Sequence, residues 1–304
     1  MESRFKSLSI FEFQQLFPDD AACHAHLSNI KWKDGFTRRY CEHPKYCNGE
    51  RPYDRQCTSC NYTESPTAHT VFHMVKFPLV KAFWIVYYLS STKKGMASTE
   101  LSRKLELRQK TCWLFKRKVM KAMKSSGDYP MQGTVEVDEA VVGGQEENVR
   151  GRANKKKRLV LFAIERKGKG VSRMYGKVIP SAHAKNLGAF MKETIDTKAN
   201  VRTDGWTGYA PLKKQFKNLR QEKSQPKGRN FKEMHRIIMG FKGWLRGVHH
   251  HASHLQAYVD EYTFRFNRCF MKEGVFENLL QRMMRTEPCP YKTLYNPKCL
   301  IQSN

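Results

Sequence analysis

The sequence predicts a mixed α/β fold preceded by smaller helical and cysteine-rich modules, and three observations support this. Three segments between residues 133 and 179 alternate apolar and polar residues and are separated by glycine-rich breaks, as strands are. An amphipathic helical segment follows them, and then come a short strand and two further helical segments. This order of elements is typical of a mixed sheet with helices packed on it.

The expected elements follow one another along the chain with short connections. The expected helices are 79–91, 97–107, 108–123, 181–195, 231–247 and 253–268. The expected strands are 133–144, 157–168, 170–179 and 199–204, with "KGKG" as a hairpin turn. "SSGDYP" has the composition of a linker. The predicted divisions are a helical arm (1–35), a cysteine-rich module (36–75), a helical region (76–127), an α/β domain (130–285) and a C-terminal tail (286–304).

Positive charge dominates the composition. The 55 Lys and Arg residues outweigh 28 Asp and Glu residues and give a formal net charge of +27, which indicates a polyanionic partner. The longest apolar run, "FWIVYYL", is far shorter than the roughly 20 residues of a membrane span, and the N-terminus has no signal-peptide pattern. The nine cysteines without an export signal favour a reducing cytoplasm. Nucleic acid is therefore the predicted partner.

Four of the cysteines crowd into one short segment. Cys57 and Cys60 have the C-x2-C spacing at which two thiolates reach one tetrahedral zinc ion. The first pair, Cys41 and Cys47, is irregular and has His43 between its members. We predict a structural zinc site formed by Cys41, Cys47, Cys57 and Cys60, in which His43 could replace one cysteine. Buried cysteines without a metal are the alternative.

The segment "STELSRKLELRQKTCWLFKRKVMKAM" resembles a helix-turn-helix with a break near "LELR". A helix of this charge suits the major groove of DNA and its phosphates. The alternative is the solvated basic face of a helical bundle. The predicted apolar core is Leu101, Leu105, Trp113, Leu114 and Val119. The residues predicted to contact DNA are Arg103, Lys104, Arg108, Lys110, Lys116, Arg117 and Lys118.

Two polar clusters in the second half of the chain have simpler interpretations. The run "RANKKKR" contains Lys155, Lys156 and Lys157, which we expect to bind phosphates, with a solvated turn as the alternative. The histidines near residue 250 are interpreted as a polar loop that opens the next helix.

Two acidic residues stand at strand ends in this basic chain. Asp138 follows "TVEV", and Asp204 ends "VRTD" just before a glycine. Two strand-borne carboxylates can hold divalent cations, which activate water and stabilise a leaving oxygen at phosphorus. The alternative is that both acids cap turns.

"VDEAVVGG", "TDGWTGY" and "WLRGVHHHASHLQAYVDEYTFRFNR", behind the cysteine pair and "TAHTVFH", resemble bacterial insertion-sequence transposases of the zinc-ribbon group related to Merlin elements. The resemblance covers about residues 30–270 and is most specific at "EYTFRFNR". It implies an RNase H-like, DDE-type catalytic domain whose acidic triad binds two Mg²⁺ or Mn²⁺ ions. By resemblance, Asp138 is the first acid and Asp204 the second. Many relatives have a C-x2-C first knuckle, where this chain has Arg38 and Cys41.

The third catalytic position also departs from the family. Relatives often carry glutamate there, with Lys or Arg seven residues later, and counting back from Lys242 reaches His235. Two residues seven apart on an α-helix point in nearly the same direction, about 20° apart, so His235 and Lys242 share a face. Glu233, the rival for the third position, points roughly 160° away from His235. Imidazole binds divalent transition metals, so we predict His235 as a ligand and Lys242 as a phosphate contact. Since Mn²⁺ tolerates imidazole better than Mg²⁺, activity with Mn²⁺ should at least equal that with Mg²⁺. A histidine in an inactive site is the alternative.

The resemblance implies a DNA transposase that binds terminal inverted repeats and catalyses metal-dependent cleavage and strand transfer with an Asp-Asp-His site. By family analogy it would act as a homodimer or larger assembly on double-stranded terminal and target DNA, in the bacterial cytoplasm at the nucleoid and without a membrane. An inactive DNA-binding regulator derived from a transposase and a metal-dependent nuclease are the alternatives.

Overall fold

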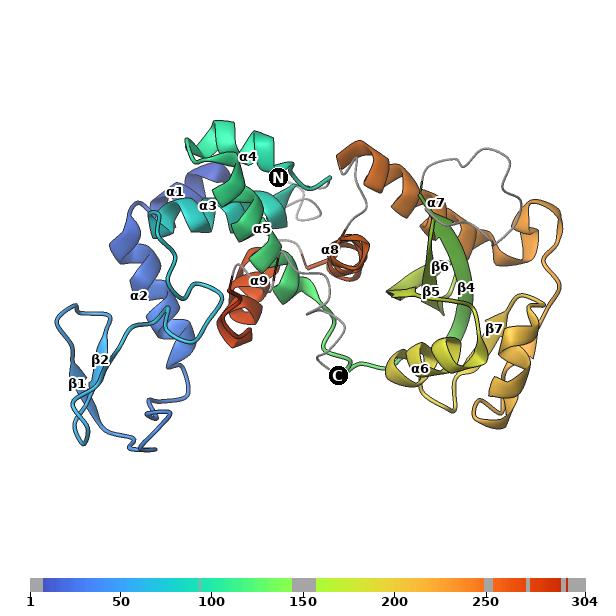
Figure 1. Ribbon diagram of the computed structural model, residues 1–304, viewed down its shortest axis with the longest axis horizontal. Helices are drawn as coiled ribbons and strands as arrows, with labels where there is room; N and C mark the ends of the chain where they lie inside the picture. Colours follow the sequence, from blue (N-terminus) through green and yellow to red (C-terminus); the bar gives the residue numbers. More distant parts are fainter. Residues whose placement is uncertain are drawn as a thin grey trace. The chain divides into compact units, whose positions relative to one another are not determined.

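The computed structural model describes residues 8–92, 94–143, 157–248, 254–271, 274–290 and 294. The chain divides into two compact units (Figure 1). The first unit combines Met1–Met123 with Met271–Asn304, and the second is Lys124–Phe270. Among the described residues, no helix has the length and apolar character needed to cross a membrane.

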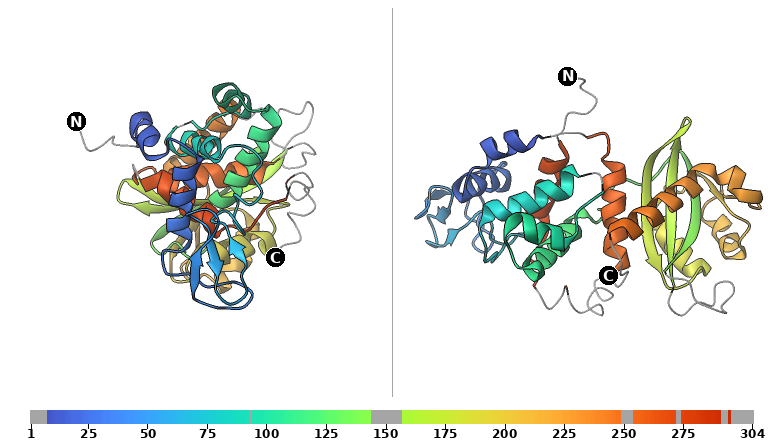
Figure 2. Two further views of the ribbon diagram at one scale, coloured as in Figure 1. Left: turned by 90° about the vertical axis from the view of Figure 1, so that its left-hand side faces the viewer. Right: turned by 90° about the horizontal axis from the view of Figure 1, so that it is seen from above.

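The second unit is built on a five-stranded sheet with the order β6-β5-β4-β7-β8 (Figures 1 and 2). β5 is antiparallel to both β4 and β6, whereas β7 is parallel to β4 and β8 is parallel to β7. The strands are β4 (Thr134–Val142), β5 (Arg158–Lys167), β6 (Gly170–Ile179), β7 (Asn200–Thr203) and β8 (Arg220–Gln221). This is the RNase H-like mixed sheet that the resemblance implied, so the predicted fold class is confirmed.

Helices cover both faces of this sheet. On one face, Leu187 and Phe190 of α6 pack in a hydrophobic core with Val135 and Val137 of β4. On the other face, α7 lies on β4 and α8 lies on β6. Gly176 of β6 lets α8 approach, because a Cβ there would come within 2.6 Å of the helix. These helices are α6 (Ala184–Thr194), α7 (Lys232–Val248) and α8 (Leu255–Asn267).

The first unit is helical apart from a small antiparallel sheet. Its helices are α1 (Ile10–Leu16), α2 (Asp20–Lys31), α3 (Leu79–Ser91), α4 (Ser98–Leu105), α5 (Gln109–Met123) and α9 (Gly274–Arg285). Ser9 and Glu12 form a capping box that starts α1, and the Asp19 side chain caps α2. Phe276 of α9 packs edge-on against Phe13 of α1, so the C-terminal helix completes this unit's aromatic core.

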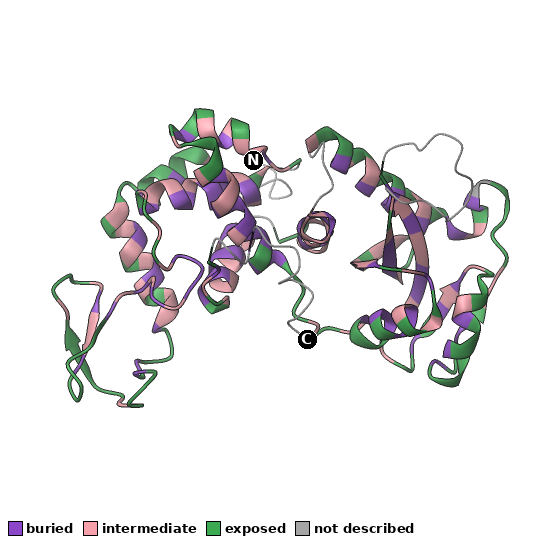
Figure 3. Cartoon of the chain, viewed as in Figure 1, coloured by how far each residue is buried: buried purple, intermediate pink, exposed green. Residues whose placement is uncertain are grey.

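The cysteine-rich module is a three-stranded antiparallel ribbon of short strands. They are β1 (Tyr46–Asn48), β2 (Arg55–Cys57) and β3 (Thr63–Glu64), in the order β1-β2-β3. β1 is exposed along its length, whereas β4 of the second unit is buried or half-buried throughout (Figure 3). The ribbon's own core is a small cluster of Trp32, Phe36 and Cys57. So few apolar side chains bury too little surface to hold a module of this kind by themselves.

Two boundaries differ from those expected from the sequence. The N-terminal arm consists of two helices, α1 and α2, which meet at the Asp19 cap. Residues 271–285, which the sequence placed in the α/β domain, belong to the first unit because α9 packs on α3, α5 and α2. The amphipathic pattern of α9, with Phe276, Leu280 and Met283 buried, predicts a helix but does not reveal which core it enters.

Candidate functional site

The two predicted acids lie side by side on the sheet. β4 and β7 pair in parallel as far as Val137 opposite Thr203, so Asp138 is the next residue on β4 and Asp204 follows directly after the end of β7. Val137 points toward α6, and side chains alternate along a strand, so Asp138 points to the α7 face. Asp204 follows the same alternation from Arg202, which contacts Glu136 on that face.

Local hydrogen bonds orient both carboxylates. Oδ1 of Asp204 accepts a hydrogen bond from the Trp206 backbone N–H at 3.0 Å, and Oδ1 of Asp138 accepts one from the Glu139 N–H at 2.8 Å. Asp204 thus forms the turn that was weighed as its alternative role. Turn formation and metal binding are compatible because each carboxylate has two oxygens.

A third acid, which sequence reasoning missed, adds to the negative field. The Tyr209 hydroxyl donates a hydrogen bond to Oε2 of Glu139 at 2.8 Å. Burial, followed by the charges of Glu139, Asp138 and Asp204, raises the pKa of Tyr209 well above its ordinary value. Tyr209 is completely buried, so it packs beneath the site and is not available to stack on a base.

The helix α7 runs along β4 past Asp138. At its start, the Met234 backbone hydrogen-bonds the Glu136 carboxylate. Seven residues later, the Phe241 ring packs on Phe162, with centroids 5.4 Å apart, and Phe162 is the register partner of Asp138. The helix therefore extends from the level of Glu136 to the level of Asp138.

His235 and Lys242 lie on one edge of this helix. They follow Met234 and Phe241 by one residue each, and both are half-buried beside the buried stripe. The imidazole of His235 packs against Gly228, whose φ of +63° favours glycine and where a Cβ would overlap the ring. The shared edge agrees with the seven-residue spacing that selected His235.

Glu233, the rival for the third position, serves a different part of the structure. It is buried on the other edge of α7 and pairs with Arg236 at 2.5 Å. It also lines a pocket of about 480 Å³ together with Glu136 and Arg202. Like charge from Glu233 is among the causes that raise the pKa of Glu136, after burial, which is the largest.

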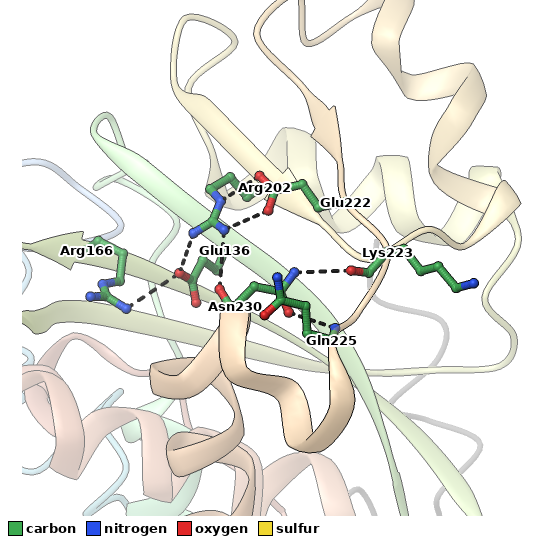
Figure 4. A network of polar contacts seen from close by, with 7 residues as sticks. All are labelled: Glu136, Arg166, Arg202, Glu222, Lys223, Gln225 and Asn230. Atoms are coloured by element: carbon green, nitrogen blue, oxygen red, sulfur yellow. Dashed lines mark hydrogen bonds and ion pairs between the residues drawn. The ribbon is translucent and has the colours of Figure 1, made fainter.

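An ion-pair network ties β4, β5, β7 and the segment that follows β8 together at this pocket (Figure 4). Glu136 is 1% exposed, and its Oε1 lies 3.5 Å from Arg166 and 3.2 Å from Arg202. Arg202 also contacts Glu222 at 2.9 Å and donates to the Asn230 carbonyl at 3.3 Å. The network therefore fixes β7, and with it Asp204, relative to β4.

The donor set suits hard divalent cations. Asp138 and Asp204 supply carboxylate oxygens from adjacent strands, and Glu139 adds negative charge that a cation would neutralise. The ligand atoms of His235 and the two aspartates are not all within 4.8 Å of one another. Within the described part of the chain, only Cys41, Cys57 and Cys60 bring three ligand atoms that close together. Asp138 and Asp204 are therefore the two candidate cation ligands of this site, and His235 lies on the helix α7 that packs on the same face of the sheet.

The cysteine cluster contains three of the four predicted zinc ligands. The Sγ atom of Cys41 lies 3.6 Å from the Sγ atoms of both Cys57 and Cys60. Zinc–sulfur bonds of about 2.3 Å in a tetrahedron would place sulfurs about 3.8 Å apart, so these three thiols fit one zinc ion. Cys47 does not join them: it lies exposed on β1, with Sγ 3.7 Å from the Gln56 carbonyl.

His43 and Arg38 are the remaining polar residues of interest in the first knuckle. His43, the possible substitute ligand, shares a hydrogen bond with the Thr58 hydroxyl at 3.0 Å. Arg38 lies against the cluster instead. A backbone hydrogen bond at Tyr62 is the largest influence on the Cys60 thiol, and with hydrogen bonds from Cys41, Cys57 and Arg38 it lowers the pKa to about 7.

The predicted helix-turn-helix forms, but its basic residues do not all face solvent. α4 ends at Leu105, Glu106 has a φ of 53°, and α5 begins at Gln109, so the break lies where the sequence placed it. Leu101, Leu105 and Val119 are buried as predicted, whereas Trp113 and Leu114 are only half-buried. Of the residues predicted to contact DNA in this segment, Arg103, Lys104, Arg108 and Lys110 are exposed.

Lys116 and Arg117 were expected on the outside, and the structure corrects this. Lys116 is 4% exposed and donates to the Met96 carbonyl at 2.7 Å, and Arg117 is 6% exposed. Both lie on the buried side of α5, between Cys112 and Met120, so their position on the helix buries them although their side chains are charged. Lys118 is half-buried, and burial lowers its pKa. Lys157 is half-buried, while Lys155, Lys156 and most of the histidines near residue 250 lie outside the described residues.

Comparison with known proteins adds a family to this geometry. Residues 130–267 match the family model described as an ISXO2-like transposase domain. A solved structure entitled "Crystal structure of a pre-cleavage Mos1 transpososome" is similar at 11% identity and a TM-score of 0.19, covering 68% of this chain and 79% of that chain. We draw nothing from a similarity of that size. No curated protein matches the chain. The matched domain contains Asp138 and Asp204 and both helices of the α7 face, so this part of the chain is similar to the ISXO2-like transposase domain.

Proposed function

We propose that this chain is the transposase of an insertion sequence, which binds the element's terminal inverted repeats and catalyses metal-dependent cleavage and strand transfer. The observation that supports this best is the pair formed by Asp138 and Asp204. Asp138 lies on β4 and Asp204 directly follows the end of the parallel strand β7, within the matched transposase domain.

In this proposal each residue of the site has a separate task. Asp138 and Asp204 bind two divalent cations, which would supply an activated water and stabilise the leaving oxygen at phosphorus. His235 is the third ligand and approaches from α7. Lys242, about two turns further along the same edge of α7, contacts a DNA phosphate near the scissile bond.

The first unit holds the DNA. The exposed basic residues Arg103, Lys104, Arg108 and Lys110 surround the α4–α5 turn, where they can reach phosphates. A zinc ion bound by the cysteine cluster would compensate for the ribbon's small core. Two element ends must be joined, so we propose a homodimer or larger assembly acting at the nucleoid in the cytoplasm.

Cleavage of a labelled element end, with Mn²⁺ or Mg²⁺, tests the function. Asp138→Asn and Asp204→Asn should each abolish cleavage while binding of the same DNA is retained, because the amide removes the charge that holds the cation. Asp196→Asn is the matched control, since Asp196 lies just before β7 and its carboxylate accepts from the Lys198 N–H. Cleavage that persists in both variants would place the active site elsewhere.

An inactive DNA-binding regulator remains the second candidate, and the position of His235 supports it. The ligand atoms of His235, Asp138 and Asp204 do not all lie within 4.8 Å of one another. If the wild-type protein binds element ends and cleaves them with neither cation, this candidate replaces the transposase. A nuclease would cleave the ends without joining them to target DNA.

A further inference from the structure

The two knuckles of the ribbon have the same backbone geometry. In the second knuckle, the Cys57 N–H donates to the Tyr62 carbonyl at 3.0 Å, and the Asn61 N–H donates to the Cys57 carbonyl at 3.0 Å. Asn61 has a φ of 55°, in the left-handed region. The same chain reversal therefore presents Cys57 and Cys60 on one side of the turn.

The first knuckle repeats every one of these contacts, with Arg38 as its first residue. The Arg38 N–H donates to the His43 carbonyl at 3.0 Å, and the Glu42 N–H donates to the Arg38 carbonyl at 2.8 Å. Glu42 has a φ of 54°. Arg38 is thus the counterpart of Cys57, and Cys41 is the counterpart of Cys60.

Burial supports the same correspondence. Cys57 and Arg38 are buried, at 0% and 5% exposure, whereas Cys41 and Cys60 are exposed. A ribbon with four protein ligands would carry a thiolate at each of these positions. In this chain one of the four positions holds a guanidinium, which has no lone pair available for a metal.

The surroundings of Arg38 explain how a buried cation is accommodated there. Its guanidinium lies 3.7 Å from the Tyr62 ring centroid and 3.6 Å from a carboxylate oxygen of Glu64. Nε and Nη1 nevertheless make no hydrogen bond. A buried arginine with unused donors beside thiols is costly unless it compensates negative charge. Three thiolates around a zinc ion leave one net negative charge, which Arg38 would balance.

We propose that the ribbon binds zinc through three protein ligands, Cys41, Cys57 and Cys60, and that Arg38 occupies the fourth ligand's place and leaves one coordination position to water or another small ligand. Cys47 does not fill that position, since its sulfur lies against Gln56 on β1. This proposal extends the zinc site proposed above and is independent of whether the chain cleaves DNA.

Cobalt substitution of the full-length protein tests the ligand number directly. The intensity of the thiolate-to-cobalt charge-transfer band increases with each coordinated sulfur, so the wild-type protein should show the band of three thiolates. Cys47→Ser should leave both the band and the metal stoichiometry unchanged. Cys60→Ser should lower the band by about one third, because one of three thiolates is lost.

Arg38→Cys is the complementary variant, because it places a thiolate at the vacant corner. The band should rise in the ratio of four thiolates to three, and zinc should be withdrawn by a chromogenic chelator more slowly than from the wild type. The expected gain in zinc affinity exceeds the roughly 10- to 100-fold effect of outer contacts at metal sites. Glu64 keeps an ion pair with Lys31 at 2.6 Å in this variant, so it does not become an isolated buried charge.

Two results would overturn the proposal, and both are available even if Arg38→Cys fails to fold. A four-thiolate band in the wild type that falls to three in Cys47→Ser would identify Cys47 as the missing ligand. A wild-type protein that binds neither cobalt nor zinc would show that Arg38 has replaced the metal itself. Neither result bears on the cleavage assay, so the two proposals fail separately.

Discussion

The helix α7 and the ribbon each carry a basic side chain where the resemblance to insertion-sequence transposases implies a metal ligand. On α7 the resemblance implies glutamate where His235 stands, and in the ribbon it implies cysteine where Arg38 stands. His235 is half-buried at the edge of a helix, whereas Arg38 is 95% buried in a turn that reproduces the second knuckle.

The difference between the two sites lies in what the replacement can still do. A neutral imidazole keeps a lone pair and can coordinate a transition metal, so His235 can change the metal preference without emptying the position. A guanidinium has five donors and no acceptor, so Arg38 can only balance charge. The two replacements by a basic residue therefore have different chemical consequences.

The largest effect is expected from removing His235. His235→Ala should lower the rate of end cleavage by more than about 100-fold, because outer-sphere changes at metal sites already cost about 10- to 100-fold. His235→Glu should retain cleavage and shift the preference from Mn²⁺ toward Mg²⁺, since carboxylate is the harder ligand. Rates measured across a titration of each cation report both effects.

Glu233→Gln is the control for this experiment, because Glu233 lies on the same helix but faces the pocket of Glu136. It should leave the metal dependence of cleavage unchanged. If His235→Ala cleaved element ends at the wild-type rate, His235 would not be part of the site, and its comparison with Arg38 would no longer hold.

A smaller effect is expected from Gly228→Ala, which changes the support of His235 and not the residue itself. The new methyl group would overlap the imidazole, and a non-glycine residue at a φ of +63° is strained by about 1–3 kcal/mol. Gly168→Ala is matched to it, with a φ of +57° and nothing within 4 Å of the added Cβ. Thermal unfolding and cleavage rates should show that both variants lose stability, whereas only Gly228→Ala also loses cleavage. Equal cleavage in the two variants would mean that the position of the ring is unimportant.

The smallest effect concerns the network that fixes the strands beneath α7. Hydrogen bonding to Arg202 holds the pKa of Glu222 below its ordinary value of 4.5. A lowered folded-state pKa contributes stability above pH 4.5 that is lost as the pH falls through the folded value. Because Glu222 is 38% exposed, solvent screening keeps this contribution below about 1 kcal/mol. Burial raises the pKa of Glu136, so its contribution has the opposite sign and is lost as the pH rises.

Denaturant unfolding at pH 7 and pH 4 checks this expectation. Glu222→Gln should reduce the loss of stability between the two pH values, whereas Glu193→Gln, which removes an exposed pair with Lys177, should not. An unchanged pH dependence in Glu222→Gln would show that Arg202 stabilises the neutral and charged forms equally.

Periodicity in the sequence predicted the parts of this fold that repeat. Alternation located β4, β5 and β6, and the seven-residue spacing placed His235 and Lys242 on one edge of α7. β8 consists of only two residues and pairs through β7, so no local pattern could predict it. For α9 the local pattern predicts a helix but does not show which core the helix enters, so residues 271–285 were assigned to the α/β domain.

Charge in the sequence was a poorer guide than spacing. Lys116 and Arg117 are basic, yet the helical register of α5 buries them, and position in the stripe outweighs polarity. Glu136 and Glu139 are three residues apart on β4, and successive side chains of a strand point to opposite faces. The sequence could therefore have indicated that the two glutamates face different sides of the sheet. Their partners, Arg202 and Tyr209, lie about 70 residues away and are brought near only by the β4–β7 pairing.

The path of the chain through the two units has a consequence for deletion experiments. The chain leaves the first unit after Met123 and returns to it at Met271, so the second unit is an insertion tethered at both ends. A protein shortened after Phe270 would keep the whole five-stranded sheet but lose α9, whose Phe276, Leu279 and Met283 are buried against the other helices. A C-terminal truncation therefore damages the first unit. An isolated first unit needs both of its segments, joined by a linker in place of residues 124–270.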